Sequence, residues 1–279
     1  MEIRFTKMQG CGNDYVYIDC HGQEITEPGS LAKTLADRHY GIGGDGIVLI
    51  LPSSLADAKM RMFNADGSEG GMCGNAIRCV AKHLYESRIV SSLNMSIETL
   101  SGIKTLTLYT KDGLVSSVKV DMGAAVLTPG DIPVRLPGDS VIAKTVDIAG
   151  STYSITCVSM GNPHAVVFSD DVQSIDVHKI GPLFEGNELF PDRVNTEFVQ
   201  VIGKNRLKMR VWERGSGLTL ACGTGACAAA VAAVLNGYCD EGDDITVQLD
   251  GGELIINYTP QRVLMAGDCK KVFEGMIQI

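Results

Sequence analysis

The chain has 279 residues, of which 45% are hydrophobic and 20% are charged, as is typical of a soluble globular protein. Its formal net charge of −9 argues against nucleic acid or an anionic membrane as the main partner, because both bind basic surfaces. Nine cysteines are too few for a disulfide scaffold, and the first residues lack the apolar segment of a signal peptide. We therefore expect a cytoplasmic protein with reduced thiols.

Strands and helices are expected to alternate along the chain. β-Branched and aromatic residues predict strands at 16–18, 47–51, 59–63, 105–109, 114–120, 165–168 and 207–212. Helices are predicted at 31–39, at about 75–87 and at about 224–235, where Asn236-Gly237 ends the last one. Glycine and proline gather at 122–137, which is therefore the most linker-like stretch.

One uncharged stretch, 215–239, has the hydropathy of a membrane segment. Its densely apolar part, 226–235, is shorter than the ~20 residues that a membrane-spanning helix needs. The stretch therefore predicts a buried core helix.

An internal repeat is the most informative feature of the sequence. Three pairs of landmarks share an offset of 149 positions: Gly12-Asn13 with Gly161-Asn162, Arg61 with Arg210, and Cys73-Gly74 with Cys222-Gly223. Each copy has a Gly-Asn turn, a strand, a polar loop and a Cys-Gly pair that opens a helix. The repeat predicts two similar domains, and two such helix starts facing one cleft would bring two cysteines to one ligand.

Cys73 and Cys222 are the candidate catalytic residues. The first N–H groups of a helix lack partners within it, and their partial positive charge stabilises a thiolate or a bound carboxylate. A cysteine in this position can have its pKa lowered from ~8.5 toward neutrality. A thiolate on one face of an α-carbon and a thiol on the other can move its proton, which is the chemistry of amino-acid epimerisation. Such a reaction needs no cofactor if water is excluded.

The other candidate residues have simpler interpretations. His164 follows a Gly-Asn-Pro turn at the start of a strand, and Arg214 is either a surface ion-pair partner or a clamp for a carboxylate. The glycine-rich segment 41–46 is predicted to be a turn rather than a phosphate loop. The cysteine spacings favour neither a metal site nor thioredoxin-like redox chemistry. Core packing is predicted for Cys20, Cys79, Cys157, Cys227, Cys239 and Cys269.

Several short blocks carry a family resemblance: NADGSE at 64–69, MCGN at 72–75, GNPH at 161–164, ERG at 213–215 and ACGTGAC at 221–227. Together with Gly12-Asn13-Asp14-Tyr15 they resemble the diaminopimelate epimerase family over nearly the whole chain. The resemblance implies conversion of LL- to meso-2,6-diaminopimelate without pyridoxal phosphate or metal, in lysine and peptidoglycan precursor biosynthesis. It also implies a cytoplasmic enzyme that is usually a homodimer.

The implied fold is α/β of the α+β type, with two pseudo-symmetric domains that arose by duplication. Each domain would be a mostly antiparallel sheet wrapped around a central helix. The domains would be residues 1–121 and 122–267, with a final strand at 268–279 returning to the first.

The resemblance also implies roles for individual residues. Cys73 and Cys222 would be the acid/base pair, and His164 and Glu213 would set their pKa values. The residues implied to bind substrate are Asn13, Asn64, Gly74, Asn75, Asn162, Asn195, Glu213, Arg214, Gly223 and Thr224. The chain departs from the family at Gly46, Ala76 and Leu218, where glutamine, glycine and glutamate are usual, which leaves the contacts with the far end of the substrate open.

Other functions remain alternatives. Proline racemases and hydroxyproline epimerases share the two-cysteine design, but they carry Cys-Gly-His at the first motif, where this chain has Asn75. Phenazine-pathway proteins lack the paired cysteines. A non-catalytic binding protein would tolerate serine at Cys73 and Cys222, and a redox sensor would function through a disulfide between them.

Overall fold

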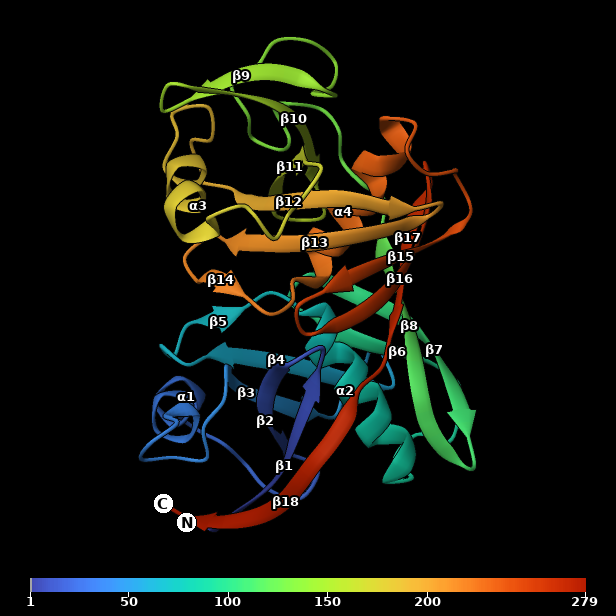
Figure 1. The fold of residues 1–279 in the computed structure, drawn as a ribbon. Coiled ribbons are helices and arrows are strands. Elements are labelled where there is room, and N and C mark those ends of the chain that lie inside the picture. The colour runs from blue at the N-terminus through green and yellow to red at the C-terminus, as the bar shows by residue number, and fades with distance from the viewer. Residues whose placement is uncertain (1) are drawn as a thin grey trace. The chain divides into compact units, whose positions relative to one another are not determined.

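The computed structural model describes residues 2–279, whose contacts divide them into two compact units (Figure 1). The first unit runs to Asp121 and takes in Ala266–Ile279, and the second is Met122–Met265. Among the described residues, no helix is long and apolar enough to cross a membrane.

The first unit combines a mixed sheet with two helices. β1 pairs antiparallel with β2 and with β18, so the C-terminal strand lies beside the N-terminal one (Figure 1). β2 pairs parallel with β3, β3 antiparallel with β4, and β4 parallel with β6. The elements are β1 (Glu2–Gly10), β2 (Asn13–Asp19), α1 (Pro28–Ala36), β3 (Gly46–Leu51), β4 (Ala58–Asn64), β5 (Glu69–Gly70), α2 (Gly74–Glu86), β6 (Asn94–Thr99), β7 (Gly102–Lys111), β8 (Leu114–Gly123) and β18 (Lys270–Gln278).

The second unit repeats this order of elements and pairings. β10 pairs antiparallel with β9 and β11, β11 parallel with β12, β12 antiparallel with β13, and β13 parallel with β15. The elements are β9 (Lys144–Ile148), β10 (Ser151–Ser159), β11 (Pro163–Phe168), α3 (Val177–Glu185), β12 (Asn195–Gly203), β13 (Arg206–Glu213), β14 (Gly217–Thr219), α4 (Gly223–Leu235), β15 (Asp244–Leu249), β16 (Gly252–Thr259) and β17 (Arg262–Gly267).

The sequence repeat is therefore a repeat of structure. Tyr15 lies opposite Gly46 in the first unit, and His164 lies opposite Asn195 in the second, each 149 positions further on. Most strand pairs are antiparallel and helices are few, which confirms the predicted α+β fold with two similar halves.

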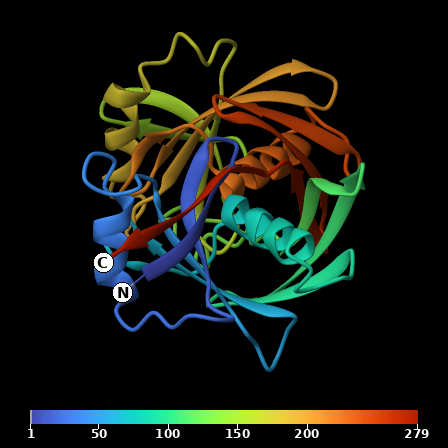
Figure 2. The ribbon, with the colours of Figure 1, turned by 90° about the horizontal axis from the view of Figure 1, so that it is seen from below.

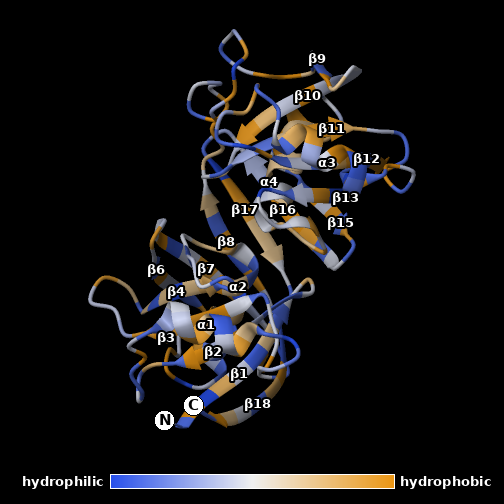
Figure 3. Cartoon of the chain, turned by 90° about the vertical axis from the view of Figure 1, so that its left-hand side faces the viewer, coloured by the Kyte–Doolittle hydropathy of each residue, from blue (hydrophilic) through white to orange (hydrophobic). Residues whose placement is uncertain are grey.

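α2 and α4 are the central helices of their units. α2 contacts β1, β2 and β7, and Figure 2 shows it enclosed by strands of its own unit. α4 contacts β10–β13, β15 and β16, and every residue at 226–233 is fully buried, as predicted for a core helix. Its small side chains let the surrounding strands pack closely. Hydrophobic stretches, orange in Figure 3, run along strands of both units.

Two helices differ from the sequence prediction. The helix predicted at 31–39 is wrong at both ends, because α1 begins at Pro28, whose fixed φ suits the first turn, and ends at Ala36. Asp37 stops it by accepting the backbone N–H groups of residues 39 and 40, each at 2.7 Å. The sequence does not predict α3, since Gly181-Pro182 is typical of a break. Gly181 is needed there because a Cβ would lie 2.3 Å from the Trp212 ring.

Candidate functional site

Cys73 is the residue immediately before α2. Its backbone is extended, with φ −128° and ψ 122°, and the helix begins at Gly74. The partly exposed thiol donates to Asn13 Oδ1 at 3.3 Å. The first unit therefore presents a thiol at a helix N-terminus and directs an amide oxygen at it.

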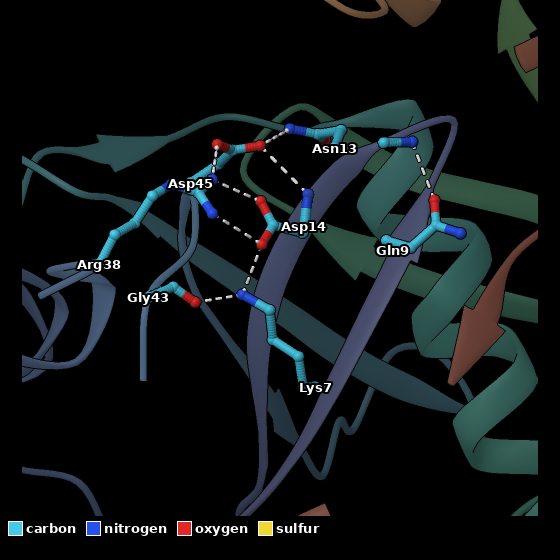
Figure 4. Close-up of polar contacts among 8 residues, drawn as sticks. Lys7, Gln9, Asn13, Asp14, Arg38, Gly43 and Asp45 are labelled. Carbon is cyan, nitrogen blue, oxygen red and sulfur yellow. Dashed lines mark hydrogen bonds and ion pairs between the residues drawn. The ribbon is translucent and has the colours of Figure 1, made fainter. Parts of the chain in front are cut away.

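Asn13 opens β2 and is held in turn by a charged network (Figure 4). Its Nδ2 donates to Asp45 Oδ2 at 2.6 Å. Arg38 donates to Asp45 at 3.1 Å and to Asp14 at 2.7 Å, and Lys7 lies 2.7 Å from the other oxygen of Asp14. Burial raises the pKa of Asp14, but the hydrogen bonds from Arg38 and Lys7 outweigh this and the net pKa is lowered.

Cys222 holds the equivalent place in the second unit. It precedes α4 with an extended backbone, φ −121° and ψ 113°, and is 5% exposed. Its Sγ accepts the N–H of Gly225 at 3.4 Å and lies 3.5 Å from Thr224 Oγ1. Burial raises the pKa of this thiol well above its usual value and the charges of Glu213 and Glu197 add to the rise, against the two hydrogen bonds. The second unit therefore holds its cysteine as a neutral thiol.

Glu213 lies at the end of β13, near Cys222. Burial raises the pKa of its carboxyl, and the hydrogen bonds from Thr219 and Cys222 only partly offset this rise. A carboxylate with a raised pKa accepts a proton more readily. Glu213 is therefore suited to exchange a proton with the Cys222 thiol.

His164 and Glu197 form a fully buried pair. Both are 0% exposed, and His164 Nδ1 lies 2.7 Å from Glu197 Oε1. The other ring nitrogen lies 3.1 Å from Asn162 Oδ1. Both ring nitrogens therefore face oxygen atoms, which fixes the orientation of the ring. The second oxygen of Glu197 is buried and has no hydrogen-bond partner within residues 2–279.

The side chain of Asn195 is hydrogen-bonded to the backbone of Arg214. Asn195 is 3% exposed, donates to Pro163 O at 2.8 Å and accepts the N–H of Arg214 at 2.9 Å. The exposed guanidinium of Arg214 donates to Asp192 O at 2.8 Å. Asn195 thus anchors the loop that carries Arg214.

The other predicted substrate residues lie at turns and helix starts. Asn64, at the end of β4, donates to Ser68 Oγ at 3.0 Å, so its amide is directed into its own turn rather than at Cys73. Asn75 is 2% exposed, and its Oδ1 lacks a hydrogen-bond partner in the described part of the chain. Gly74 and Gly223 are the buried first residues of α2 and α4.

The remaining cysteines are mostly core residues. Cys20 is only partly buried. Cys11 is buried beside Arg78, whose Nη2 lies 3.8 Å from the Cys11 sulfur. The cysteines that are buried as predicted are Cys79, Cys157, Cys227, Cys239 and Cys269. Across residues 2–279, no group of three or more His, Cys, Asp or Glu side chains is arranged to hold a metal ion.

Sequence reasoning missed two charged residues, Asp45 and Glu197. Asp45 is the only charged residue of the glycine-rich segment 41–46, and Glu197 is the only one at 194–203. A lone charge in such a segment is the signal that could have identified them, because a charged side chain among apolar or glycine residues is kept where it has a partner, as the fully buried Glu197 and the partly exposed Asp45 both do. At Gly46, by contrast, a Cβ would lie 2.0 Å from Phe63 O, so the backbone leaves no room for a side chain.

Comparisons of the sequence with known proteins agree on one family. The sequence model of diaminopimelate epimerase matches residues 5–128 and 156–272. Proteins named diaminopimelate epimerase from Acetivibrio thermocellus and Desulfovibrio desulfuricans are each 52% identical, over 99% and 98% of this chain and 99% and 97% of their own. One from Agathobacter rectalis is 49% identical over 99% of this chain and all of its own.

Solved structures of lower identity share the fold. A phenazine biosynthesis protein of the PhzF family from Bacillus anthracis has 16% identity and a TM-score of 0.69, covering all of both chains. A hydroxyproline epimerase from Agrobacterium vitis has 14% identity and a TM-score of 0.68, covering 99% of this chain and 91% of its own. Relatives near 50% identity match almost end to end, and the family's sequence model spans both units, so the chain belongs to the diaminopimelate epimerase family.

Proposed function

We propose that this chain is an isomerase that epimerises LL-2,6-diaminopimelate to the meso form, in lysine and peptidoglycan precursor biosynthesis. One observation carries the proposal: each unit of this family member places a cysteine immediately before its central helix, Cys73 at α2 and Cys222 at α4. Inverting an α-carbon without a cofactor requires such a pair, with one group for each face.

In the proposed reaction, the thiolate of one cysteine removes the α-proton and the thiol of the other delivers a proton to the opposite face. The electron pair left on the α-carbon is shared with the adjacent carboxylate, which therefore gains negative charge. The backbone N–H groups at Gly74-Asn75 and Gly223-Thr224 supply the helix-terminal donors for that charge. Each turnover leaves the proton on the opposite cysteine, and the two exchange roles in the reverse direction.

Glu213 activates Cys222 in this scheme. Its carboxylate takes the thiol proton, which gives a carboxylic acid and a thiolate, and its raised pKa makes this uphill transfer less costly. The ring of His164 is held in place between Glu197 and Asn162. Arg214 provides an exposed guanidinium for a substrate carboxylate. Asn13, Asn64, Asn162 and Asn195 are the proposed amide contacts of the substrate, and those of Asn64 and Asn195 would first have to release Ser68, Pro163 and Arg214.

We place the reaction in the cytoplasm, where thiols stay reduced, and propose a homodimer. The support for a dimer is β18, which exposes Val272, Phe273 and Met276, followed by Ile279. A second copy that covers these apolar side chains would remove them from water. Sedimentation of the purified protein tests this, and a monomer at all concentrations would contradict it.

The reaction is tested by incubating reduced protein with LL-diaminopimelate in deuterated water, without added pyridoxal phosphate or metal. Proton NMR is expected to show loss of the α-proton signal and appearance of the meso isomer. Exchange of proline or hydroxyproline instead would assign the chain to those racemases. No exchange with any of these amino acids, in fully reduced protein, would leave a binding or redox-sensing role.

A further inference from the structure

The glycine-rich segment 41–46 connects α1 to β3 and packs against β2. Its N–H groups complete the end of α1, where residues 42 and 43 both donate to Leu35 O at 2.9 Å and Gly44 donates to Ala36 O at 3.0 Å. A Cβ at Gly44 would lie 2.9 Å from Asp14 O, so the glycine lets the segment lie against β2. The close approach brings the next side chain, Asp45, to the start of β2.

Asp45 is locked in place by its neighbours on both sides. Its backbone N–H donates to Asp14 O at 2.7 Å, and its carbonyl accepts the N–H of Ala65 at 3.0 Å. Its Oδ1 accepts from Arg38 at 3.1 Å, while its Oδ2 accepts from the backbone of Asp14 at 3.1 Å and from Asn13 Nδ2 at 2.6 Å (Figure 4).

We propose that Asp45 is a positioning residue, whose carboxylate fixes the amide of Asn13 so that the amide oxygen faces Cys73 and keeps that cysteine a proton-donating thiol. The inference rests on the proposed function, in which Cys73 is one of the two acid/base groups.

The orientation of the Asn13 amide follows from which hydrogen bonds each group can donate. A carboxylate accepts hydrogen bonds and donates none, so Asp45 Oδ2 selects the NH₂ end of the Asn13 amide. The oxygen of that amide is then left facing Cys73 Sγ at 3.3 Å. An oxygen stabilises an S–H and repels a thiolate, whereas an NH₂ group would stabilise the thiolate. Rotating this one amide by 180° would therefore favour the thiolate of Cys73, where the present orientation favours the thiol.

Two further side chains of this unit, Tyr17 and Asp45, lie near Asn13 and Cys73 in the site. Burial raises the pKa of the Tyr17 phenol, and the charges of Cys79 and Cys73 add to the rise, so the phenol stays neutral. Asp45 reaches the cysteine through Asn13 rather than directly. The carboxylate itself is anchored by Arg38 and by the backbone of Asp14, so it can hold the amide in one orientation.

The experiment measures how the alkylation of Cys73 by iodoacetamide depends on pH in substrate-free protein, resolved by peptide mass spectrometry. In Asp45→Asn the residue at 45 can donate or accept, so the amide of Asn13 is no longer oriented. The midpoint for Cys73 is expected to fall by about one pH unit, the order of one lost hydrogen bond, while the midpoint for Cys222 in the same sample stays unchanged.

Three further variants separate orientation from simple removal of charge. Asp14→Asn removes a charge from the same network, but its side chain does not contact Asn13, so it is expected to leave the Cys73 midpoint unchanged. Asn13→Leu removes the amide itself; it should lower the midpoint, and adding Asp45→Asn to it should then have no further effect. Arg38→Gln changes an exposed side chain and should shift the midpoint in the same direction by less than Asp45→Asn, which keeps the test available if Asp45→Asn does not fold.

An unchanged midpoint in folded Asp45→Asn, or the same shift in the Asn13→Leu background, would overturn the proposal. The measurement uses no substrate, so it decides the role of Asp45 even if the protein fails to epimerise diaminopimelate.

Discussion

The N-termini of α2 and α4 are equivalent in sequence and fold, but they surround their cysteines differently. Cys73 is partly exposed and faces a neutral amide oxygen. Cys222 is 5% exposed, and burial together with the charges of Glu213 and Glu197 raises the pKa of its thiol. An amide can hold a thiol proton but cannot take it, whereas a carboxylate can. The two helix starts therefore share a backbone and differ in the proton chemistry that their side chains allow.

The difference comes from a few side chains at equivalent positions. The acidic and histidine residues of the second unit have other residue types 149 positions earlier: Asn64 for Glu213, Val48 for Glu197 and Tyr15 for His164. Conversely, the charged network behind Asn13 has uncharged counterparts 149 positions later: Thr156 for Lys7, Pro163 for Asp14, Asn187 for Arg38 and Val194 for Asp45. Each unit thus has, near its cysteine, ionisable side chains that the other unit lacks at the equivalent positions.

The largest expected effect comes from removing each thiol. Cys73→Ser and Cys222→Ser should each lower kcat by roughly 10³-fold or more, because a hydroxyl is a far weaker acid than a thiol and general acid–base catalysis contributes up to about 10⁴-fold. The two variants should differ in deuterated water, since each retains one thiol. Each should exchange the α-proton of only one of the two isomers, and slowly.

Proton NMR of LL- and meso-diaminopimelate incubated with each variant measures this selectivity. Circular dichroism confirms that both variants are folded. Near-native epimerisation by either variant, or exchange of both isomers by both, would contradict a division of labour between the two helix starts.

A smaller effect is expected at the third residue of each helix, Gly225 in α4 and Ala76 in α2. A Cβ at Gly225 would lie 2.7 Å from Glu197 Oε1 and 3.3 Å from Cys222 Sγ. Gly225→Ala must therefore displace the carboxylate that holds His164, and we expect kcat/KM to fall about tenfold and stability to fall by about 1–3 kcal/mol. The matched change, Ala76→Gly, should cost at most about 1 kcal/mol through helix propensity and leave kcat/KM near the original value.

Steady-state kinetics and thermal unfolding of both variants make this comparison. If Ala76→Gly lowered kcat/KM as much as Gly225→Ala, the position would matter equally in both units and the proposed difference between them would be wrong.

The helix starts were predictable from the sequence, and the groups that surround them were not. Cys-Gly followed by an apolar run locates α2 and α4 to within a residue, because the signal is local. The pairs Asn13–Asp45 and His164–Glu197 depend on where one strand meets the next. Parallel pairing of β11 with β12 sets His164 opposite Asn195, two residues before Glu197, and no local pattern specifies that register. The final strand was expected only from the family resemblance, for the same reason, since KKVFEGMIQ alternates only in part and becomes β18 by pairing with β1.

The smallest expected effect is on stability, and its dependence on pH has opposite signs in the two units. The pKa of Glu213 is raised from 4.5 by burial, so its contribution to stability is present at low pH and is lost as pH rises through the raised pKa. The pKa of Asp14 is lowered from 3.8, because hydrogen bonds from Arg38 and Lys7 outweigh the effect of burial, so its contribution is present at neutral pH and is lost as pH falls through the lowered pKa.

Glu213→Gln should therefore raise Tm by a few degrees at pH 8 and have little effect at pH 4. Asp14→Asn should lower Tm by a similar amount at pH 7, and the difference should shrink as the pH falls below 4. Thermal unfolding by circular dichroism at pH 3, 4, 7 and 8 measures both trends, and trends of the same sign would show that the two helix starts are supported in the same way.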